Sequence, residues 1–307
     1  MKRTHNICCR TAAVFSDIHA NAPAFRACYQ DALANGADCF LFLGDYVSDL
    51  ADARDTLTLL NEIRSRYPTA CLKGNRERYM LEHRNGVSEF SEGSKTGSLL
   101  YTFRQLEEQD LEWFQSLPIY DVIELNGIPF ELAHAAREND RFYFEGTDEW
   151  EASFSRVFQE METEYLLTGH SHKQYIRCKG TKTILNPGSI GVPRDHGSLT
   201  QYALIHFRGA KPWFDLRKLP YNVPETIHRQ FESGLVEMAP HWAISVLYDA
   251  VTGKENTMEL LSRVNEIAGG DPDVLRDEAV WHTVAEALGM KFTEMEIREF
   301  YKNQTAI

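Results

Sequence analysis

The strongest constraint on the fold is an alternation near the start of the chain. Three short apolar segments, at 12–15, 39–43 and 70–72, alternate with two segments whose apolar residues recur at helical spacing, at 22–35 and 52–66. Strands and helices that alternate in this way form parallel sheets, because each helix carries the chain back to the start of the next strand. The sequence therefore predicts an α/β fold whose first three strands lie side by side.

Each of these three strands ends at a polar residue. Asp17 and His19 follow the first strand, Asp45 follows the second, and Asn75 follows the third. Residues two apart in an extended segment point to the same side, so we expect Asp17 and His19 to face one point. Open α/β sheets hold their ligands at the C-terminal ends of the strands. The sequence therefore predicts a polar site at this edge of the sheet.

Later strands deliver more residues of the same kind. Asn126-Gly127 predicts a hairpin turn, and the strand that follows it, at 128–133, leads to His134. A strand at 165–168 leads to Gly169-His170-Ser171-His172. Mixed carboxylate, amide and imidazole ligands suit Mn, Fe, Zn, Co or Ni better than calcium. The set exceeds the needs of one ion and suits two ions bridged by a carboxylate. The candidate ligands are Asp17, His19, Asp45, Asn75, His134, His170 and His172.

The second half of the chain predicts more strands and then a group of helices. We expect residues 99–117 to form one helix and residues 273–288 to form another. After Pro220 the composition becomes helical, with glycine or proline between the segments. We therefore predict a catalytic domain at 1–219 and a helical C-terminal extension at 220–307, which is a candidate dimerisation element. We expect four antiparallel strands to complete a second sheet, at 174–178, 183–185, 201–207 and 213–219.

Charge and cysteine content narrow the class of protein. The net charge of −13 argues against a long nucleic acid or an anionic membrane as a partner. A small phosphorylated substrate held by bound cations is compatible with this charge. The six cysteines form no C-x-x-C pair, and the first ten residues lack the long apolar segment of a signal peptide. These features indicate reduced thiols and a cytoplasmic protein.

The order of the polar motifs resembles that of a known family. The series D-x-H, G-D, G-N, H and G-H-x-H is similar to the calcineurin-like metallophosphoesterase superfamily, and Asn186-Pro187-Gly188-Ser189 resembles a segment of its bacterial phosphodiesterase-like branch. The resemblance covers residues 12–219. It implies a four-layer αββα sandwich of the α/β (α+β) class, with the C-terminal helices as an extension. It further implies two divalent ions, manganese among the candidates. One ion is assigned to Asp17, His19, Asp45 and His172, and the other to Asp45, Asn75, His134 and His170, so that Asp45 bridges them.

The same resemblance implies a reaction. A hydroxide that bridges the two ions attacks phosphorus, and the ions neutralise the charge that builds on the phosphoryl oxygens. We expect hydrolysis of phosphodiester or nucleotide anhydride bonds in a small phosphorylated substrate such as a nucleotide. Three alternatives stay open. They are a protein serine/threonine phosphatase, a phosphomonoesterase, and a non-catalytic scaffold on the same fold.

One position departs from the family pattern. Much of the family has histidine directly after the Gly-Asn pair, where this chain has Arg76. Arginine cannot donate a proton near neutral pH, but it can hold phosphoryl oxygens with two N–H groups. We interpret Arg76 as a catalytic residue that binds phosphate beside Asn75 and stabilises charge, with Asp45 as the bridging carboxylate. The alternative is an Arg76 that points outward into solvent.

Weaker candidates surround this set. Asn21 is either a phosphate contact or the cap of the helix that follows it. A nucleotide phosphate could meet basic residues, and a base could stack on Phe142–Phe144, although solvation and packing are the ordinary roles of such side chains. The basic candidates are Lys95, Arg104, Arg137 and Arg194.

Overall fold

The computed structural model describes residues 6–135, 147–207 and 211–305. Arg137 and Phe142–Phe144, named above as weaker candidates, lie outside these residues. The described part is a mixed α/β fold with two sheets, as the sequence predicts.

The predicted alternation forms the centre of the first sheet. Strands β2 (Thr11–Phe15), β3 (Cys39–Phe42) and β4 (Thr69–Cys71) are parallel neighbours. Helices α1 (Ala22–Ala34) and α2 (Ala53–Arg66) connect them. The C-terminal ends of the three strands therefore lie together at one edge of the sheet.

The last two strands join this first sheet, which corrects one prediction. We expected β10 (Leu199–His206) and β11 (Trp213–Pro220) to complete the second sheet. Instead β10 pairs antiparallel with β2, and β11 pairs with β10. Seven of the eight residues of β10 are buried, so β10 needs neighbours on both of its edges and on both of its faces. That pattern predicts a central strand but does not indicate which sheet contains it.

Six described strands make up the second sheet, in the order β1-β5-β6-β7-β9-β8. The predicted hairpin is confirmed, because β5 and β6 are antiparallel and both Asn126 and Gly127 have positive φ angles. Strand β7 runs parallel to β6 and β9, while β8 runs antiparallel to β9. The strands are β1 (Asn6–Ile7), β5 (Tyr120–Leu125), β6 (Ile128–Ala133), β7 (Tyr165–Thr168), β8 (Gln174–Lys179) and β9 (Lys182–Pro187).

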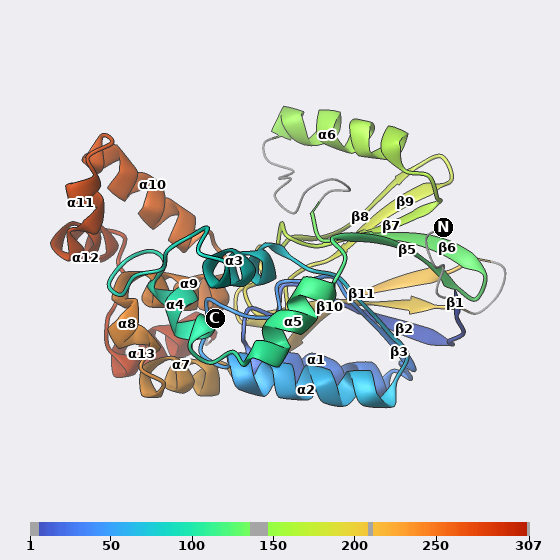
Figure 1. The fold of residues 1–307 in the computed structure, drawn as a ribbon, viewed down its shortest axis with the longest axis horizontal. Coiled ribbons are helices and arrows are strands. Elements are labelled where there is room, and N and C mark those ends of the chain that lie inside the picture. Colours follow the sequence, from blue (N-terminus) through green and yellow to red (C-terminus); the bar gives the residue numbers. More distant parts are fainter. Residues whose placement is uncertain (1–5, 136–146, 208–210, 306–307) are drawn as a thin grey trace.

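The two sheets pack face to face between layers of helices. Val14 of β2 and Leu132 of β6 belong to the hydrophobic cluster between the sheets. Phe15, on the other face of β2, packs in a cluster with α1 and α2. Helix α6 (Thr147–Glu160) covers the outer face of the second sheet through Phe154. Figure 1 shows these layers in the order of the predicted αββα sandwich, with α6 above and α1 and α2 below.

Three helices lie between β4 and β5, and two of them replace what was predicted as a single helix. The structure has α3 (Asn75–Arg84), and it divides the predicted helix at 99–117 into α4 (Gly97–Phe103) and α5 (Glu108–Ser116). The Asp110 side chain accepts a hydrogen bond from the N–H of Glu107, which starts a new helix at that point.

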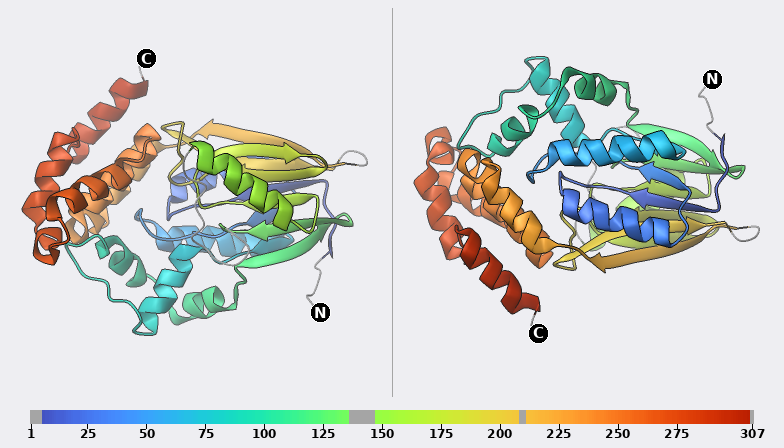
Figure 2. Two further views of the ribbon diagram at one scale, coloured as in Figure 1. Left: turned by 90° about the horizontal axis from the view of Figure 1, so that it is seen from above. Right: turned by 90° about the horizontal axis from the view of Figure 1, so that it is seen from below.

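The chain after β11 is helical, as predicted. The predicted helix at 273–288 is interrupted at Asp277, whose side chain accepts a hydrogen bond from the N–H of Ala279 and so caps a new helix. Figures 1 and 2 show these helices gathered at one end of the sandwich. They are α7 (Val223–Glu232), α8 (Leu235–Met238), α9 (Pro240–Thr252), α10 (Asn256–Ala268), α11 (Pro272–Arg276), α12 (Glu278–Ala287) and α13 (Glu294–Thr305).

These helices share a hydrophobic core with the sandwich. Ile244 and Leu247 of α9 pack in one cluster with Leu50 and Val192, which lie in loops at the C-terminal ends of the strands. The helical segment is therefore close to the predicted site. None of the helices in the described part of the chain combines the length and the apolar character that crossing a membrane requires.

Candidate metal centre

The first group of candidate ligands comprises Asp17, His19 and His172. Their potential ligand atoms all lie within 4.8 Å of one another. The expected convergence is therefore present, but the backbone that produces it is not extended. Asp17 and His19 have φ angles of 54° and 48°, in the left-handed region. The N–H groups of Asp17 and His19 donate to the carbonyls of Gly44 and Asp45, so this turn is fixed to the end of the neighbouring strand.

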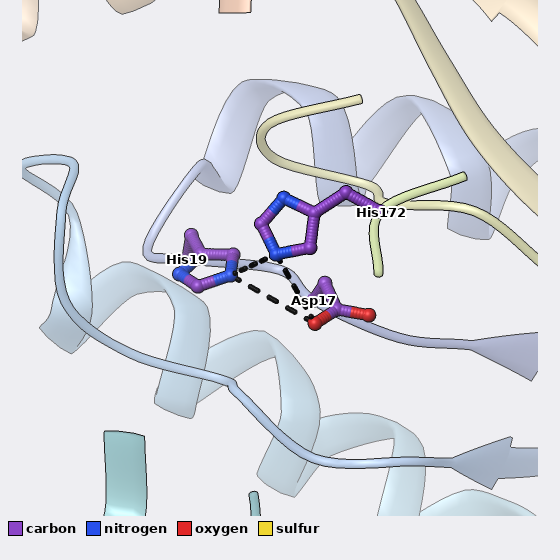
Figure 3. A group of neighbouring side chains, drawn as sticks. All are labelled: Asp17, His19 and His172. Carbon is purple, nitrogen blue, oxygen red and sulfur yellow. Dashed lines mark hydrogen bonds and ion pairs between the residues drawn. The ribbon is translucent and has the colours of Figure 1, made fainter. Parts of the chain in front are cut away.

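The three side chains point toward one another (Figure 3). Nε2 of His19 lies 3.0 Å from Nε2 of His172, and Oδ1 of Asp17 lies 3.3 Å from the latter atom. Nδ1 of His172 lies 2.8 Å from the carbonyl oxygen of Val192, which can only accept a hydrogen bond. A neutral His172 therefore presents an unprotonated Nε2 to the group, which is the form that binds metals.

The carboxylate of Asp17 has one oxygen committed to the protein and one available. Oδ2 accepts hydrogen bonds from Ser16 Oγ and from the N–H of His170. Oδ1 is buried and accepts no hydrogen bond from any residue that the structure describes. A buried carboxylate oxygen beside two imidazole nitrogens fits a divalent cation, because burial without a partner is otherwise costly. The first group of residues therefore fits a metal ion.

The second group comprises Asp45, His134 and His170, again with ligand atoms within 4.8 Å of one another. Oδ2 of Asp45 lies 3.4 Å from Nε2 of His134 and 3.7 Å from Nε2 of His19. Asp45 therefore lies between the two groups, where a bridging ligand would be placed. The side-chain oxygen of Asn75 lies 3.1 Å from Nε2 of His134. All seven predicted ligands thus meet at one edge of the two sheets.

The pKa values of the two histidines in the second group depend on the charged residues around them. Burial by itself lowers the pKa of His134, but the negative charges of Asp45 and Asp17, together with the hydrogen bonds of His134, outweigh burial and raise this pKa to about 10. The pKa of His170 falls to about 3 because of burial and the nearby His134. The negative charge of Asp45 stabilises a protonated His134 and attracts a cation in the same way. A proton and a metal ion therefore compete for this site.

Two glycines allow the loops that carry these ligands to approach closely. A Cβ on Gly44, which has a φ of +105°, would lie 2.6 Å from the backbone nitrogen of Gly74. A Cβ on Gly74 would lie 2.2 Å from Oδ1 of Asp45. Neither position has space for a side chain, so the Gly-Asp and Gly-Asn pairs each need their glycine.

Glu77 is a site residue that the sequence analysis missed. Its fully buried carboxylate accepts hydrogen bonds from the N–H groups of Asp45, Tyr46 and Gly74, at 2.9, 2.8 and 2.9 Å. Burial, with the nearby charge of Asp45, raises its pKa to about 7. Glu77 therefore joins the two ligand-bearing loops. The available signal was a glutamate three residues after Gly74, the residue that precedes the helix, which is the spacing of a capping box.

Asp49 is a second residue that sequence reasoning missed. Its Oδ2 lies 3.0 Å from Nδ1 of His19 and 2.8 Å from Nη2 of Arg76, and its Oδ1 accepts a hydrogen bond from the indole N–H of Trp242 at 3.1 Å. Burial alone raises the pKa of Asp49, but the charge of Arg76 together with the hydrogen bonds of His19 and Trp242 holds this pKa below its usual range. Asp49 lies in a loop and no motif indicates it, so its role depends on contacts that only the fold creates.

Arg76 lies beside the two groups of ligands rather than pointing outward. Its N–H donates to Oδ1 of Asp45 at 2.8 Å, and its side chain is 20% exposed. It lines a cavity of about 570 Å³ next to the ligands, a size typical of small-molecule sites. Lys95 and Arg194 line the same cavity, whereas Arg104 does not and forms an ion pair with Glu92.

Asn21 is not among the residues that line this cavity. Its fully buried side chain accepts a hydrogen bond from the N–H of Ala24, which caps α1, and donates to the carbonyl of Gly191. The structure therefore shows the capping role. The amide group is occupied inside the protein, and we do not retain Asn21 as a phosphate contact.

Known proteins with a similar sequence or fold cover most of the chain. A protein of Methanocaldococcus jannaschii named "Uncharacterized protein MJ0912" is 23% identical over 251 residues, which are 75% of this chain and 94% of that protein. The crystal structure of a metallophosphoesterase from Sphaerobacter thermophilus has a TM-score of 0.61 at 21% identity, over 78% of this chain and 100% of that one.

A crystal structure of hypothetical protein PH1004 from Pyrococcus horikoshii has a TM-score of 0.62 at 17% identity, over 81% of this chain and 100% of that one. At these identities, the two structures establish the likeness of fold. Residues 11–210 match the family model described as the calcineurin-like phosphoesterase superfamily domain.

Proposed function

The chain belongs to the calcineurin-like phosphoesterase superfamily, and we propose that it uses two divalent ions to hydrolyse phosphodiester or nucleotide anhydride bonds. The observation that carries this proposal is the meeting of two buried groups of ligand-type side chains beside a cavity that also contains Arg76. All seven ligand positions are present, which favours an enzyme over a scaffold on the same fold.

The proposed ligand assignment follows the two groups. One ion is assigned to Asp17, His19, Asp45 and His172, and the other to Asp45, Asn75, His134 and His170. When bound, such ions supply positive charge to the phosphoryl oxygens and lower the pKa of water so that it can attack phosphorus. Manganese, iron, zinc, nickel and cobalt all suit this donor set.

The protein itself orients the phosphate in this proposal. Asp49 forms an ion pair with Arg76 and so limits the motion of a guanidinium that lines the cavity. Arg76 is then placed to donate N–H groups to the phosphoryl oxygens and to stabilise the negative charge that develops on them. Asn75 lines the same cavity, so a phosphate contact through its side-chain N–H₂ group is part of the proposal.

The identity of residue 76 predicts a substrate preference. An arginine does not release a proton near neutral pH, so the leaving oxygen must depart with little help from this position. We therefore propose that the substrates are small phosphate esters with good leaving groups, such as aryl diesters or nucleotides. Alkyl phosphomonoesters need more protonation of the leaving group and are expected to react slowly.

Paired substrates test this preference. Metal-free protein supplied with Mn, Fe, Zn, Ni or Co is assayed on bis(p-nitrophenyl) phosphate and on p-nitrophenyl phosphate. We expect the diester to react faster in the wild type, and Arg76→His to shift the ratio of the two rates by about tenfold toward the monoester. The proposed role of Arg76 is wrong if the wild type and Arg76→His give the same ratio.

A further inference from the structure

The C-terminal helices form part of the wall of the proposed substrate cavity. Trp242 and Val246 of α9 line it, together with Met258 and Leu261 of α10. These four side chains are apolar or aromatic, and the polar residues Asp249 and Thr257 of the same two helices also line the cavity. The metal centre contributes imidazole, carboxylate and guanidinium groups to the same cavity. The cavity therefore has a charged part and an apolar part.

The apolar part is open to a ligand. Met258 is 44% exposed, although it is a large apolar side chain, and it lines the cavity. Exposed apolar surface inside a cavity is typical of a binding site. The thioether of methionine and the indole of tryptophan both make favourable contacts with aromatic rings. The chemistry of this wall thus favours a ring over an extended polar chain.

The apolar part is close to the proposed phosphate contact. The indole N–H of Trp242 donates to Oδ1 of Asp49 at 3.1 Å, and Oδ2 of the same carboxylate lies 2.8 Å from Arg76. The carboxylate of Asp49 therefore lies between the indole of Trp242 and the guanidinium of Arg76. A phosphate ester held at Arg76 places its organic group within reach of this wall.

The wall is held in a fixed position. Ile244 and Leu247 are fully buried, and they anchor α9 to the loop at Leu50. The carboxylate of Asp249 in α9 accepts a hydrogen bond from the N–H of Thr257 at 3.0 Å, which fixes the start of α10. A preformed wall of this kind can select among ligands without a change of fold.

We propose that α9 and α10 form a subsite for an aromatic organic group of the phosphate ester, such as an aryl ring or a nucleobase. This inference rests on the proposed function, which places the phosphate at the metal centre. It assigns a specificity role to the helical extension, since Met258 and Leu261 contact the organic group rather than the phosphoryl group.

A binding experiment tests the subsite without turnover. Phenylphosphonate and methylphosphonate share the same charged group, lack a hydrolysable ester bond, and differ only in the ring. Calorimetric titration of the full chain, both metal-free and loaded with Mn²⁺, gives the ratio of their dissociation constants. We expect phenylphosphonate to bind about tenfold more tightly. We expect Met258→Ser and Leu261→Ala each to reduce this ratio severalfold.

Ile267→Ser is the matched control. Ile267 is an apolar residue of α10, as Met258 and Leu261 are, but it is 59% exposed and does not line the cavity. Its ratio should equal that of the wild type. No binding of phenylphosphonate, a wild-type ratio near one, or equal ratios for Met258→Ser and Ile267→Ser would overturn the subsite. Failure of the proposed function has a different result, namely no hydrolysis of bis(p-nitrophenyl) phosphate with any of the ions. The phosphonate ratio can still be measured in that case.

Discussion

Glu77 binds the backbone of both loops that carry the candidate ligands Asp45 and Asn75. Its two carboxylate oxygens accept three N–H groups inside the protein. Three N–H donors that point at one carboxylate require acceptors on both oxygens, and an uncharged amide supplies only one oxygen. The geometry of the metal centre therefore depends on a residue that is not itself a candidate ligand.

We predict that Glu77→Gln lowers the free energy of unfolding by about 1–3 kcal/mol, because an amide N–H₂ would face backbone N–H groups. Chemical denaturation measures this change. Glu82→Gln in the same helix is the control. The Glu82 side chain is 31% exposed and forms an ion pair with Arg78 within the helix, so this change should cost less than about 1 kcal/mol. Equal losses in the two variants would contradict the assigned role of Glu77.

Helix α9 is connected to the metal centre by the hydrogen bond between Trp242 and Asp49. The indole N–H of Trp242 donates to Asp49, and Asp49 lies next to both His19 and Arg76. Groups that orient metal ligands in this way usually affect activity strongly, because a displaced ligand changes the geometry of the ion. The helical extension therefore positions residues of the sandwich as well as lining the cavity.

We predict that Trp242→Phe, which keeps a ring but removes the N–H, lowers kcat on bis(p-nitrophenyl) phosphate by about tenfold. Trp281→Phe is the matched control, because it also removes an indole hydrogen bond, to the carbonyl of Leu275, but at a position in α12 that does not line the cavity. Steady-state kinetics distinguish the two variants. A similar kcat for both would show that the bond to Asp49 has no positioning role.

The buried carboxylate of Asp249, which is bonded to the start of α10, predicts that the stability of the protein depends on pH. Burial raises the pKa of Asp249 to about 7, from an ordinary value of 3.8. The folded protein therefore binds a proton here more tightly than the unfolded chain does. The resulting stabilisation is complete below about pH 4 and is lost as the pH rises through about 7.

We predict that Asp249→Asn removes this contribution, since an amide does not titrate but can still accept the hydrogen bond from the N–H of Thr257. The difference in Tm between Asp249→Asn and the wild type should move in favour of the variant as the pH rises from 4 to 8. Thermal unfolding at several pH values measures it. A difference that is constant over this range contradicts the raised pKa of Asp249.

The whole molecule joins the sandwich and the helical extension through several contacts. Arg229 of α7 forms ion pairs with Asp52 and Asp55 at the start of α2, at 2.9 and 2.7 Å. Thr226 of the same helix donates a hydrogen bond to Asn21 at the start of α1. These contacts hold the extension at the C-terminal edge of the first sheet, which is also where the candidate ligands lie. The boundary between residues 219 and 220 stays a prediction.

Much of this arrangement could be predicted from the sequence. The seven candidate ligands all lie within four residues after the end of a strand, so a local pattern of apolar and polar residues was enough to bring them to one edge. The αββα order could not be obtained from such a pattern, and the resemblance to the family supplied it. The left-handed backbone at Asp17 and His19 was also not predictable, because it depends on hydrogen bonds to the loop that follows β3.

The remaining differences come from long-range contacts. Asp49 accepts a hydrogen bond from Trp242, and Glu77 accepts one from the N–H of Asp45. Both partners are distant in sequence. Strand β10 shows the same limit, since its burial was predictable but its pairing with β2 was not. Periodicity describes how a segment is buried, and only the fold decides which segments bury one another.

The number of metal ions bound per chain is the sharpest test of the proposed metal centre, since two divalent ions are assigned to two separate groups of side chains. Three metal-free proteins are loaded with Mn²⁺, desalted and analysed by elemental mass spectrometry at neutral pH: the wild type, Asp17→Ala and Asp38→Ala. Asp38→Ala is the control, because Asp38 lies at the N-terminal end of β3 and the candidate ligands lie beyond its C-terminal end. We predict two ions per chain in the wild type and in Asp38→Ala. We predict about one ion in Asp17→Ala, together with the loss of diesterase activity. The two-ion assignment is wrong if Asp17→Ala retains two ions and full activity, or if the wild type binds no ion.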